Sequence, residues 1–200
     1  MEKGFISTTQ DGLLLDYLKK FNLSQSTINV IQNKITYQLI KKGERFSSYG
    51  KVCKRIGVLL NGLLYASYQP DGDKEEIVSR FFYLPKNLIV TSFESFHTGK
   101  PANESITAIE DSFLVCLEKD VLNDLYKTNP EINYVGRQIA EQSYIQALQR
   151  IHDLQTMDGR QRVLDFLKSN PELFNRVQKQ QIASYLGMNR NALTRFLNGR

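Results

Sequence analysis

The sequence predicts an α+β protein in which an antiparallel β-roll or barrel is followed by one long helix and a small all-α unit. Short segments rich in β-branched and aromatic residues run from about residue 35 to about 118, separated by turn-forming residues. One helical pattern then runs from about 131 to 157, and two shorter patterns meet at Gly187. With 200 residues, 41% of them apolar, the chain is long enough for one ordinary domain and a second, small one.

Composition limits the classes of protein that the chain can belong to. No stretch approaches the roughly 18 to 20 apolar residues of a membrane-spanning helix. The opening residues, MEKGFISTTQDG, lack the apolar run of a secretory signal. We therefore expect a cytoplasmic protein with no membrane partner.

The cysteines and histidines predict no metal, haem or other cofactor. Cys53 and Cys116 lie far apart and are too few to hold an iron–sulfur cluster. His97 and His152 show no pairing as haem ligands. Cys116, in the apolar run FLVCLE, is expected to be a buried, reduced thiol. Cys53 is expected to be more open, with a redox role as the less favoured alternative.

The first part of the chain predicts two helices and then a series of strands. Amphipathic patterns at about 11–21 and 24–33 predict the helices, and Ser24 is a candidate N-cap for the second. The strand segments are TYQLI, KRIGVLL, LLYASYQ, EEIVSRFFYL, NLIVTSF, ESITAIE and SFLVCLE. Their length and spacing are typical of an antiparallel barrel or sandwich. Pro70, Asp71 and Gly72 predict a tight turn between two strands.

A short helix at about 119–127 precedes the longest helical pattern. Asn129 and Pro130 mark the start of the long helix as N-cap and first-turn proline. Its apolar residues, with Tyr144 and Ala147 beside them, are Ile132, Val135, Ile139, Ile145, Leu148, Ile151 and Leu154. About 27 residues at 1.5 Å each span roughly 40 Å. So broad an apolar surface favours packing against the body on one side and a second copy on the other. Packing within one chain is the alternative.

The last part of the chain predicts a helix-turn-helix. We expect a hinge at Gly159 and a helix, RQRVLDFLKSN, that Pro171 ends. Two further helices follow in QKQQIASYLGMNRNALTRFLNGR. Their apolar seam consists of Ile182, Ala183, Leu186, Met188, Leu193, Phe196 and Leu197. Ala183 is small where the second helix crosses, and Gly187 tolerates the positive φ of a tight reversal.

The seam leaves a polar stripe on the second of these helices. Its members are Arg190, Asn191, Thr194, Arg195 and Asn198. Arginine and asparagine can each make two hydrogen bonds to a base edge in the major groove of DNA. The alternative is a charged helix face that only keeps the protein in solution. From Asp158 onward the chain has eight basic and three acidic residues, and this excess of five equals the net charge of the whole chain. Such asymmetry favours binding to DNA phosphates.

This order of elements resembles the Crp/Fnr family of bacterial transcription regulators over nearly the whole chain. The most specific parts are IASYLGMNRNALTRFL, GVLLNGLLYASYQPDGDKEEI and FESFHTGKPANESITAIEDS. The resemblance implies a cyclic-nucleotide-binding-like sensor domain at 1–130, a dimerisation helix at 131–157 and a DNA-binding domain at 158–200. It also implies base reading by Arg190, Asn191 and Arg195, and backbone contacts by Lys179 and Gln180.

Two departures from the family pattern affect the expected function. Members that bind cyclic AMP carry a Glu early in the phosphate-binding segment and an Arg followed by Ser or Thr at its end. Here Ser92 is near the Glu position, beside Glu94, and Ala102 and Asn103 stand where the Arg pair should be. Lys100 or His97 is the alternative cation for a phosphate. The second departure is a missing wing, since the sequence ends at Arg200.

The sequence thus predicts a homodimeric regulator that binds an inverted repeat in double-stranded DNA. Its effector is an unknown small molecule, not cyclic AMP, or there is none. The alternative is a cyclic-nucleotide-controlled regulatory subunit that acts through protein binding, which leaves the helix-turn-helix unexplained. An enzyme is not expected, because no Ser/His/Asp set, metal cluster or glycine-rich phosphate loop stands out.

Overall fold

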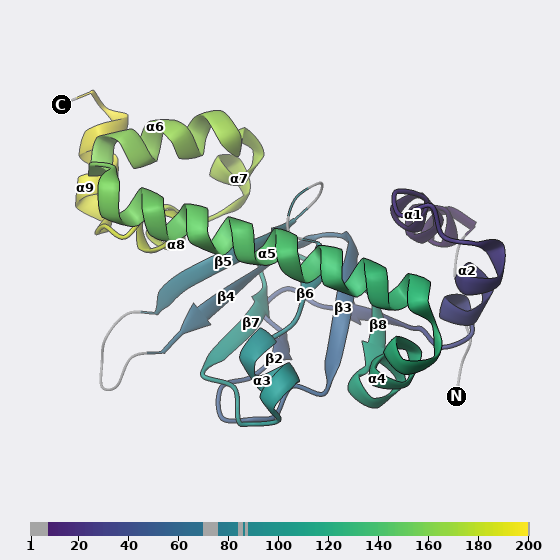
Figure 1. Ribbon diagram of the computed structural model, residues 1–200. Helices are drawn as coiled ribbons and strands as arrows, with labels where there is room; N and C mark the ends of the chain where they lie inside the picture. Colours follow the sequence, from purple (N-terminus) through teal and green to yellow (C-terminus); the bar gives the residue numbers. More distant parts are fainter. Residues whose placement is uncertain (1–7, 70–75, 84–85, 87, 200) are drawn as a thin grey trace.

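The computed structural model describes residues 8–69, 76–83, 86 and 88–199. A barrel of two antiparallel sheets forms the body, one long helix runs along it, and two groups of helices lie near opposite ends of that helix (Figure 1). The predicted α+β class and the predicted order of elements are confirmed. No helix within the described part of the chain is both long enough and apolar enough to cross a membrane.

Two short helices open the described chain, as predicted. They are α1 (Thr8–Lys19), which begins a few residues earlier than expected, and α2 (Gln25–Gln32). The Ser24 side chain caps α2 by accepting a hydrogen bond from the Thr27 N–H at 3.3 Å. Ile28 and Ile31 are buried and attach α2 to the body.

The strands pair into two four-stranded antiparallel sheets. The first has the order β1 (Thr36–Ile40), β8 (Ser112–Glu118), β3 (Arg55–Asn61) and β6 (Ile89–Val90). The second has the order β2 (Arg45–Ser47), β7 (Glu104–Ala108), β4 (Leu63–Tyr68) and β5 (Ile77–Tyr83). Helix α3 (Phe93–Thr98) connects β6 to β7. The turn predicted at Pro70, Asp71 and Gly72 lies outside the described residues.

Both cysteines are free and buried in the barrel. Burial raises the pKa of the Cys116 thiol to about 11, as expected for an inert thiol. The expectation that Cys53 is more open is wrong, because this residue is only 5% exposed. Its thiol donates to the Arg55 carbonyl at 3.3 Å, and its N–H donates to the Ser95 hydroxyl at 2.9 Å. Helix α3 packs against the loop before β3 and covers this thiol. The polar residues near Cys53 in the sequence had suggested an exposed position.

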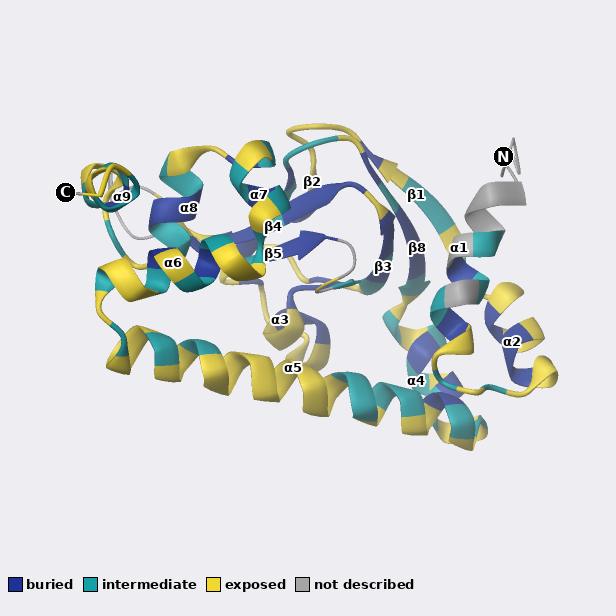
Figure 2. Cartoon of the chain, turned by 90° about the horizontal axis from the view of Figure 1, so that it is seen from above, coloured by how far each residue is buried: buried dark blue, intermediate teal, exposed yellow. Residues whose placement is uncertain are grey.

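The long helix presents its apolar residues on two opposite sides in succession. Helix α4 (Lys119–Thr128) leads into α5 (Pro130–Thr156), which begins with Asn129 as N-cap and Pro130 in the first turn, as predicted. In its first half, Ile132 is buried against the body. In its second half, Leu148 is 47% and Ile151 is 51% exposed. Figure 2 shows this second half as mostly exposed.

Four helices make up the last part of the chain. They are α6 (Gly159–Ser169), α7 (Pro171–Arg176), α8 (Lys179–Tyr185) and α9 (Arg190–Leu197). The chain leaves helical geometry at Met157 and Asp158, so the predicted hinge position is wrong by one or two residues. Gly159 is the first residue of α6, and a Cβ there would lie 3.0 Å from the Phe196 ring. Its lack of a side chain therefore serves packing against α9.

Candidate DNA-binding surface and sensor barrel

Helices α8 and α9 form the predicted helix-turn-helix. Gly187 has a φ of +69°, the left-handed conformation that a tight reversal requires. The Met188 N–H donates to the Ala183 carbonyl at 3.0 Å, and the Asn189 side chain caps α9 by accepting from the Ala192 N–H at 2.8 Å. Ala183 and Leu193 are fully buried in the seam between the helices.

The surface of α9 carries most of the predicted stripe. Arg190, Asn191, Arg195 and Asn198 are exposed. Thr194 differs from the expectation, because it is half-buried and its hydroxyl donates to the Arg190 carbonyl at 2.9 Å. This hydroxyl is thus engaged within its own helix, and the two arginines and Asn191 are the stronger candidates for contacts to bases.

The two residues predicted to touch the DNA backbone begin α8. Lys179 is exposed at the first position of the helix. Gln180 is half-buried. Lys179 therefore has the more accessible side chain and is the better candidate for a phosphate contact.

The helix-turn-helix is docked on the barrel rather than separate from it. Val163, Phe166 and Ile182 share a buried apolar cluster with Phe81 and other residues of β4 and β5. Polar contacts surround this cluster. They comprise the Ser184 hydroxyl with β5, the Tyr83 hydroxyl with Asn170, the Lys86 ammonium with the Ser169 carbonyl, and the ion pair between Arg176 and Glu110. The position of the helix-turn-helix is consequently fixed by the barrel.

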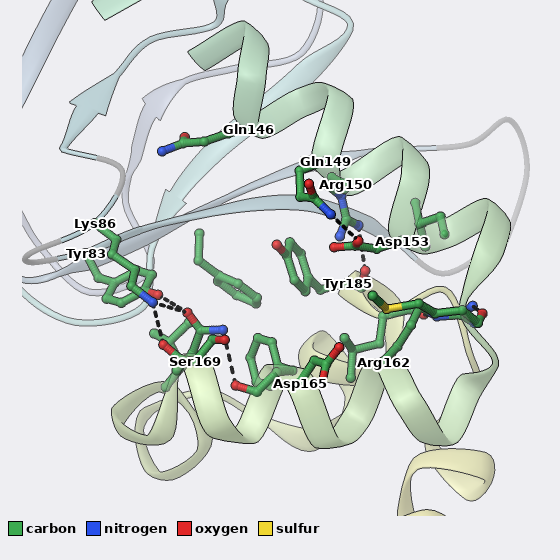
Figure 3. A pocket seen from close by; sticks show the side chains of 17 residues that line it. Tyr83, Lys86, Gln146, Gln149, Arg150, Asp153, Arg162, Asp165, Ser169 and Tyr185 are labelled. Carbon is green, nitrogen blue, oxygen red and sulfur yellow. Dashed lines mark hydrogen bonds between the residues drawn. The ribbon is translucent and has the colours of Figure 1, made fainter. Parts of the chain in front are cut away.

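A cleft of about 310 Å³ lies between the barrel, α5 and the docked helices (Figure 3). Gln146, Gln149 and Arg150 line it from α5. The Arg150 guanidinium lies over the Tyr185 ring at 3.8 Å and donates to the Tyr185 carbonyl at 2.5 Å. At these three residues the side of α5 that faces the body is polar, and Leu154 joins the lining one turn later. The solvent side carries Leu148 and Ile151.

The segment predicted to hold an effector comprises α3 and the loop to β7; we call residues 92–104 the cassette. Glu94 and Asn103 lie together, with the Asn103 amide donating to the Glu94 carboxylate at 3.0 Å. Lys100 is exposed, and its carbonyl accepts from the Ser95 hydroxyl at 2.6 Å. Ala102 is buried, and its backbone pairs with Gly50 and Lys51.

Two predicted cassette residues differ in their environment. Ser92 is buried at the N-cap of α3 but makes no capping bond, and its hydroxyl has no hydrogen-bond partner within the described chain. His97 is exposed and packs against the Phe93 and Phe96 rings. Burial lowers the pKa of His97, and the positive charge of Lys119 lowers it further. The neutral form is therefore favoured, which makes His97 a poor cation for a phosphate.

A guanidinium that no sequence motif indicated lies beside the cassette. Arg80 on β5 donates from Nη2 to the Glu104 carboxylate at 2.6 Å. The Glu104 side chain is only 4% exposed, whereas that of Arg80 is 39% exposed. Burial and the negative charges of Glu104 and Glu94 raise the pKa of Tyr68, so these groups share one electrostatic environment. The available signal was a single charged residue, Arg80, in a strand whose other members are uncharged and mostly apolar.

Three solved structures that share this fold are similar to this chain over most of its length. FixK2 from Bradyrhizobium japonicum matches with a TM-score of 0.69 and 16% identity over 82% of this chain and 83% of its own. The c-di-GMP-responsive regulator CLP from Xanthomonas campestris matches with a TM-score of 0.69 and 17% identity over 88% and 91%. A chain from Eubacterium rectale, described as a transcriptional regulator of the crp/fnr family, matches with a TM-score of 0.70 and 16% identity over 89% and 83%.

Comparison of the amino-acid sequence with known families and curated proteins finds no relative. No family model matches the chain, and no curated protein matches it. The resemblance to the Crp/Fnr family is thus confirmed in the fold, and the neighbours named above are regulators rather than enzymes.

Proposed function

We propose that this protein is a homodimeric, sequence-specific DNA-binding transcription regulator of the Crp/Fnr type, and that α9 enters the major groove. Residues 1–130 would form the sensor, 131–157 the dimerisation helix and 158–200 the DNA-binding domain. The observation that carries the proposal is the exposed set Arg190, Asn191 and Arg195 on a helix whose opposite side is buried in a helix-turn-helix seam. A regulator of this kind would act on DNA in the cytoplasm and would have no catalytic role.

The second half of α5 supports the homodimer. Tyr144, Ile145, Leu148 and Ile151 are exposed on the side of the helix away from the cleft. A helix in a globular protein normally turns its apolar side to the body. Here the body side carries Gln146, Gln149 and Arg150, so most of the apolar side is left for a second copy of the helix. A parallel two-fold pair would place two copies of α9 in successive major grooves, about 34 Å apart on an inverted repeat.

Contacts from α8 and α9 would have different roles. Arg190 and Arg195 project from the exposed side of α9 and would meet base edges, where a guanidinium makes two hydrogen bonds to guanine. Lys179 begins α8 and would meet the phosphate backbone. Base contacts supply sequence specificity, whereas phosphate contacts supply affinity that is common to all sequences.

The charges beside the cassette support an effector other than a cyclic nucleotide. Arg80 lies beside the cassette, and its guanidinium is already paired with the Glu104 carboxylate. Glu94 adds a further negative charge in the same environment. A cyclic phosphate at Arg80 would meet these two carboxylates and would have to displace the buried one. A nucleotide-controlled subunit that acts through protein binding is therefore the less favoured function.

Selection of bound sequences from a random DNA pool, followed by a test of Arg195→Ala, examines the proposal. Loss of a bidentate contact should cost about 1 to 3 kcal/mol on the selected duplex and much less on a scrambled one. Arg45→Ala, which removes an exposed arginine from the barrel, is the matched control and should bind both duplexes like the native chain. Failure to enrich any sequence would contradict the proposal, and equal losses on both duplexes would show that α9 is not the reading helix.

A further inference from the structure

Strand β5 faces the cassette on one side and the DNA-binding helices on the other. Phe82 belongs to the barrel core, and Arg80 lies over its ring with 5.6 Å between the guanidinium carbon and the ring centroid. Phe81 and Tyr83 face outward into the cluster shared with α6 and α8. Alternating residues of one strand thus contact the sensor interior and the DNA-binding domain.

A bulge extends the outer surface of β5. The register with β4 pairs Arg80 with Ala66 and Val78 with Ser67, which leaves Ser79 as an extra residue. This extra residue reverses the alternation, so Val78 joins Phe81 in the outer cluster. The N–H of Val78 donates to the Ser184 hydroxyl at 2.9 Å. Any shift of β5 at Arg80 would therefore be passed to α8 within two residues.

The Arg80–Glu104 pair holds β5 to β7 from within the barrel. Strand β4 separates these two strands in the sheet, so the pair spans it. Arg80 Nε and Glu104 Oε2 are buried and have no hydrogen-bond partner among the described residues. In this partly buried ion pair only Glu104 is fully enclosed, so removal of Arg80 would leave a buried and uncompensated carboxylate. Such an arrangement is better suited to fixing the position of β5 relative to β7 than to stabilising the fold.

We propose that Glu104 is a built-in anion that occupies Arg80 in place of an external ligand and so keeps β5, and with it the DNA-binding domain, in the docked position. Removal of the Glu104 carboxylate would create a site for a small carboxylate such as acetate. The role of the pair in docking is independent of DNA. Its effect on DNA affinity rests on the proposed function, because a docked domain is pre-organised for binding.

Chemical rescue tests the proposal on the full-length protein. In Glu104→Ala, hydrogen–deuterium exchange should become faster in β5 and α8, and sodium acetate at tens of millimolar should slow it again, whereas sodium chloride at equal ionic strength should not. The double variant Arg80→Met, Glu104→Ala should not respond to acetate. Asp124→Ala, which removes an exposed carboxylate on α4, outside β5, β7 and the cassette, is the control and should exchange like the native chain. Glu104→Gln keeps the side-chain volume and should reproduce the faster exchange if Glu104→Ala fails to fold.

The DNA readout separates this proposal from the proposed function. Loss of the pair should weaken operator binding roughly 5- to 150-fold, the usual range for coupling between sites, and acetate should reverse the loss. If the native chain binds no DNA while hydrogen–deuterium exchange in the Glu104 variants changes as expected, the proposed function is wrong, and the proposal that Glu104 is a built-in anion is retained. Unchanged exchange in both Glu104→Ala and Glu104→Gln, or an acetate response that persists without Arg80, would overturn the built-in anion.

Discussion

The Ser184 hydroxyl accepts a hydrogen bond from the Val78 N–H at 2.9 Å and donates one to the Glu76 carbonyl at 3.0 Å. Val78 belongs to β5, which is the edge strand of its sheet. The unpaired backbone groups of an edge strand must be covered or solvated. Here a side chain from the first helix of the helix-turn-helix satisfies the Val78 N–H and the Glu76 carbonyl, so this motif covers part of the edge of the barrel.

Ser184→Ala should loosen the docked domain without affecting the surface of α9. The Val78 N–H would lose its partner at a partly buried position, at a cost of about 1 to 3 kcal/mol. Hydrogen–deuterium exchange should show faster exchange at Val78, and urea denaturation should show lower stability. Ser26→Ala, at an exposed position on α2, is the control and should leave both unchanged. Native-like exchange at Val78 in Ser184→Ala would show that this bond does not fix the domain.

Leu148→Glu should convert a dimer into monomers. A glutamate in the middle of the exposed apolar side of α5 would be buried against the second copy, at a cost of at least about 2 kcal/mol. Analytical ultracentrifugation at micromolar concentration should show a dimer for the native chain and a monomer for Leu148→Glu. Gln142→Glu adds the same charge at an exposed position outside the apolar side and should remain dimeric. A native chain that is monomeric yet binds DNA would exclude this dimer.

Local signals in the sequence were sufficient to predict the order of elements and several of their ends. Ser24, Asn129 and Gly187 act on groups within a few residues, so their roles can be predicted from the neighbouring sequence. The exposed surface of α9 follows in the same way from helical periodicity. The change of side in α5 was also present as the interval of six residues between Ile139 and Ile145, where the preceding intervals are three and four.

The site inside the barrel depends on contacts that sequence spacing does not determine. Arg80 and Glu104 meet only because β5 and β7 flank β4 and because the bulge at Ser79 sets the register. Docking of α8 on β5 likewise joins residues more than a hundred positions apart, such as Val78 and Ser184. The burial of Cys53 has the same origin, because α3 supplies its cover.

The Cys116 thiol should resist alkylation in the folded protein. Its pKa, raised by burial from 9.0 to about 11, keeps it protonated at neutral pH. Because the folded-state pKa is the higher one, this thiol contributes stability below about pH 9, and the contribution is lost as the pH rises through about 11. In Cys53→Ala, iodoacetamide at pH 8 should modify Cys116 only after unfolding. Rapid modification of the folded variant would show that the thiol is accessible.

Cyclic AMP and cyclic GMP should neither bind at physiological concentration nor change the affinity for DNA. The guanidinium of Arg80 is already engaged by Glu104, and Ala102 and Asn103 supply no other cation. Isothermal titration calorimetry with each nucleotide should give no heat of binding. A dissociation constant in the low micromolar range would contradict this prediction and would identify Lys100 as the cation to remove next.

Lys179→Ala and Arg195→Ala should weaken DNA binding in different ways. Lys179 is exposed at the start of α8, where it would reach a phosphate, whereas Arg195 is exposed on α9, where it would reach a base. A phosphate contact releases a condensed counterion on every sequence, so Lys179→Ala should weaken binding to selected and scrambled duplexes by similar factors and reduce the salt slope by about one. The base contact exists only where the correct base stands, so Arg195→Ala should act mainly on the selected duplex. Fluorescence anisotropy with both duplexes at several salt concentrations measures these effects, with Arg45→Ala as the control for loss of one positive charge far from α8 and α9. A salt slope unchanged by Lys179→Ala would mean that α8 does not contact the backbone through this residue.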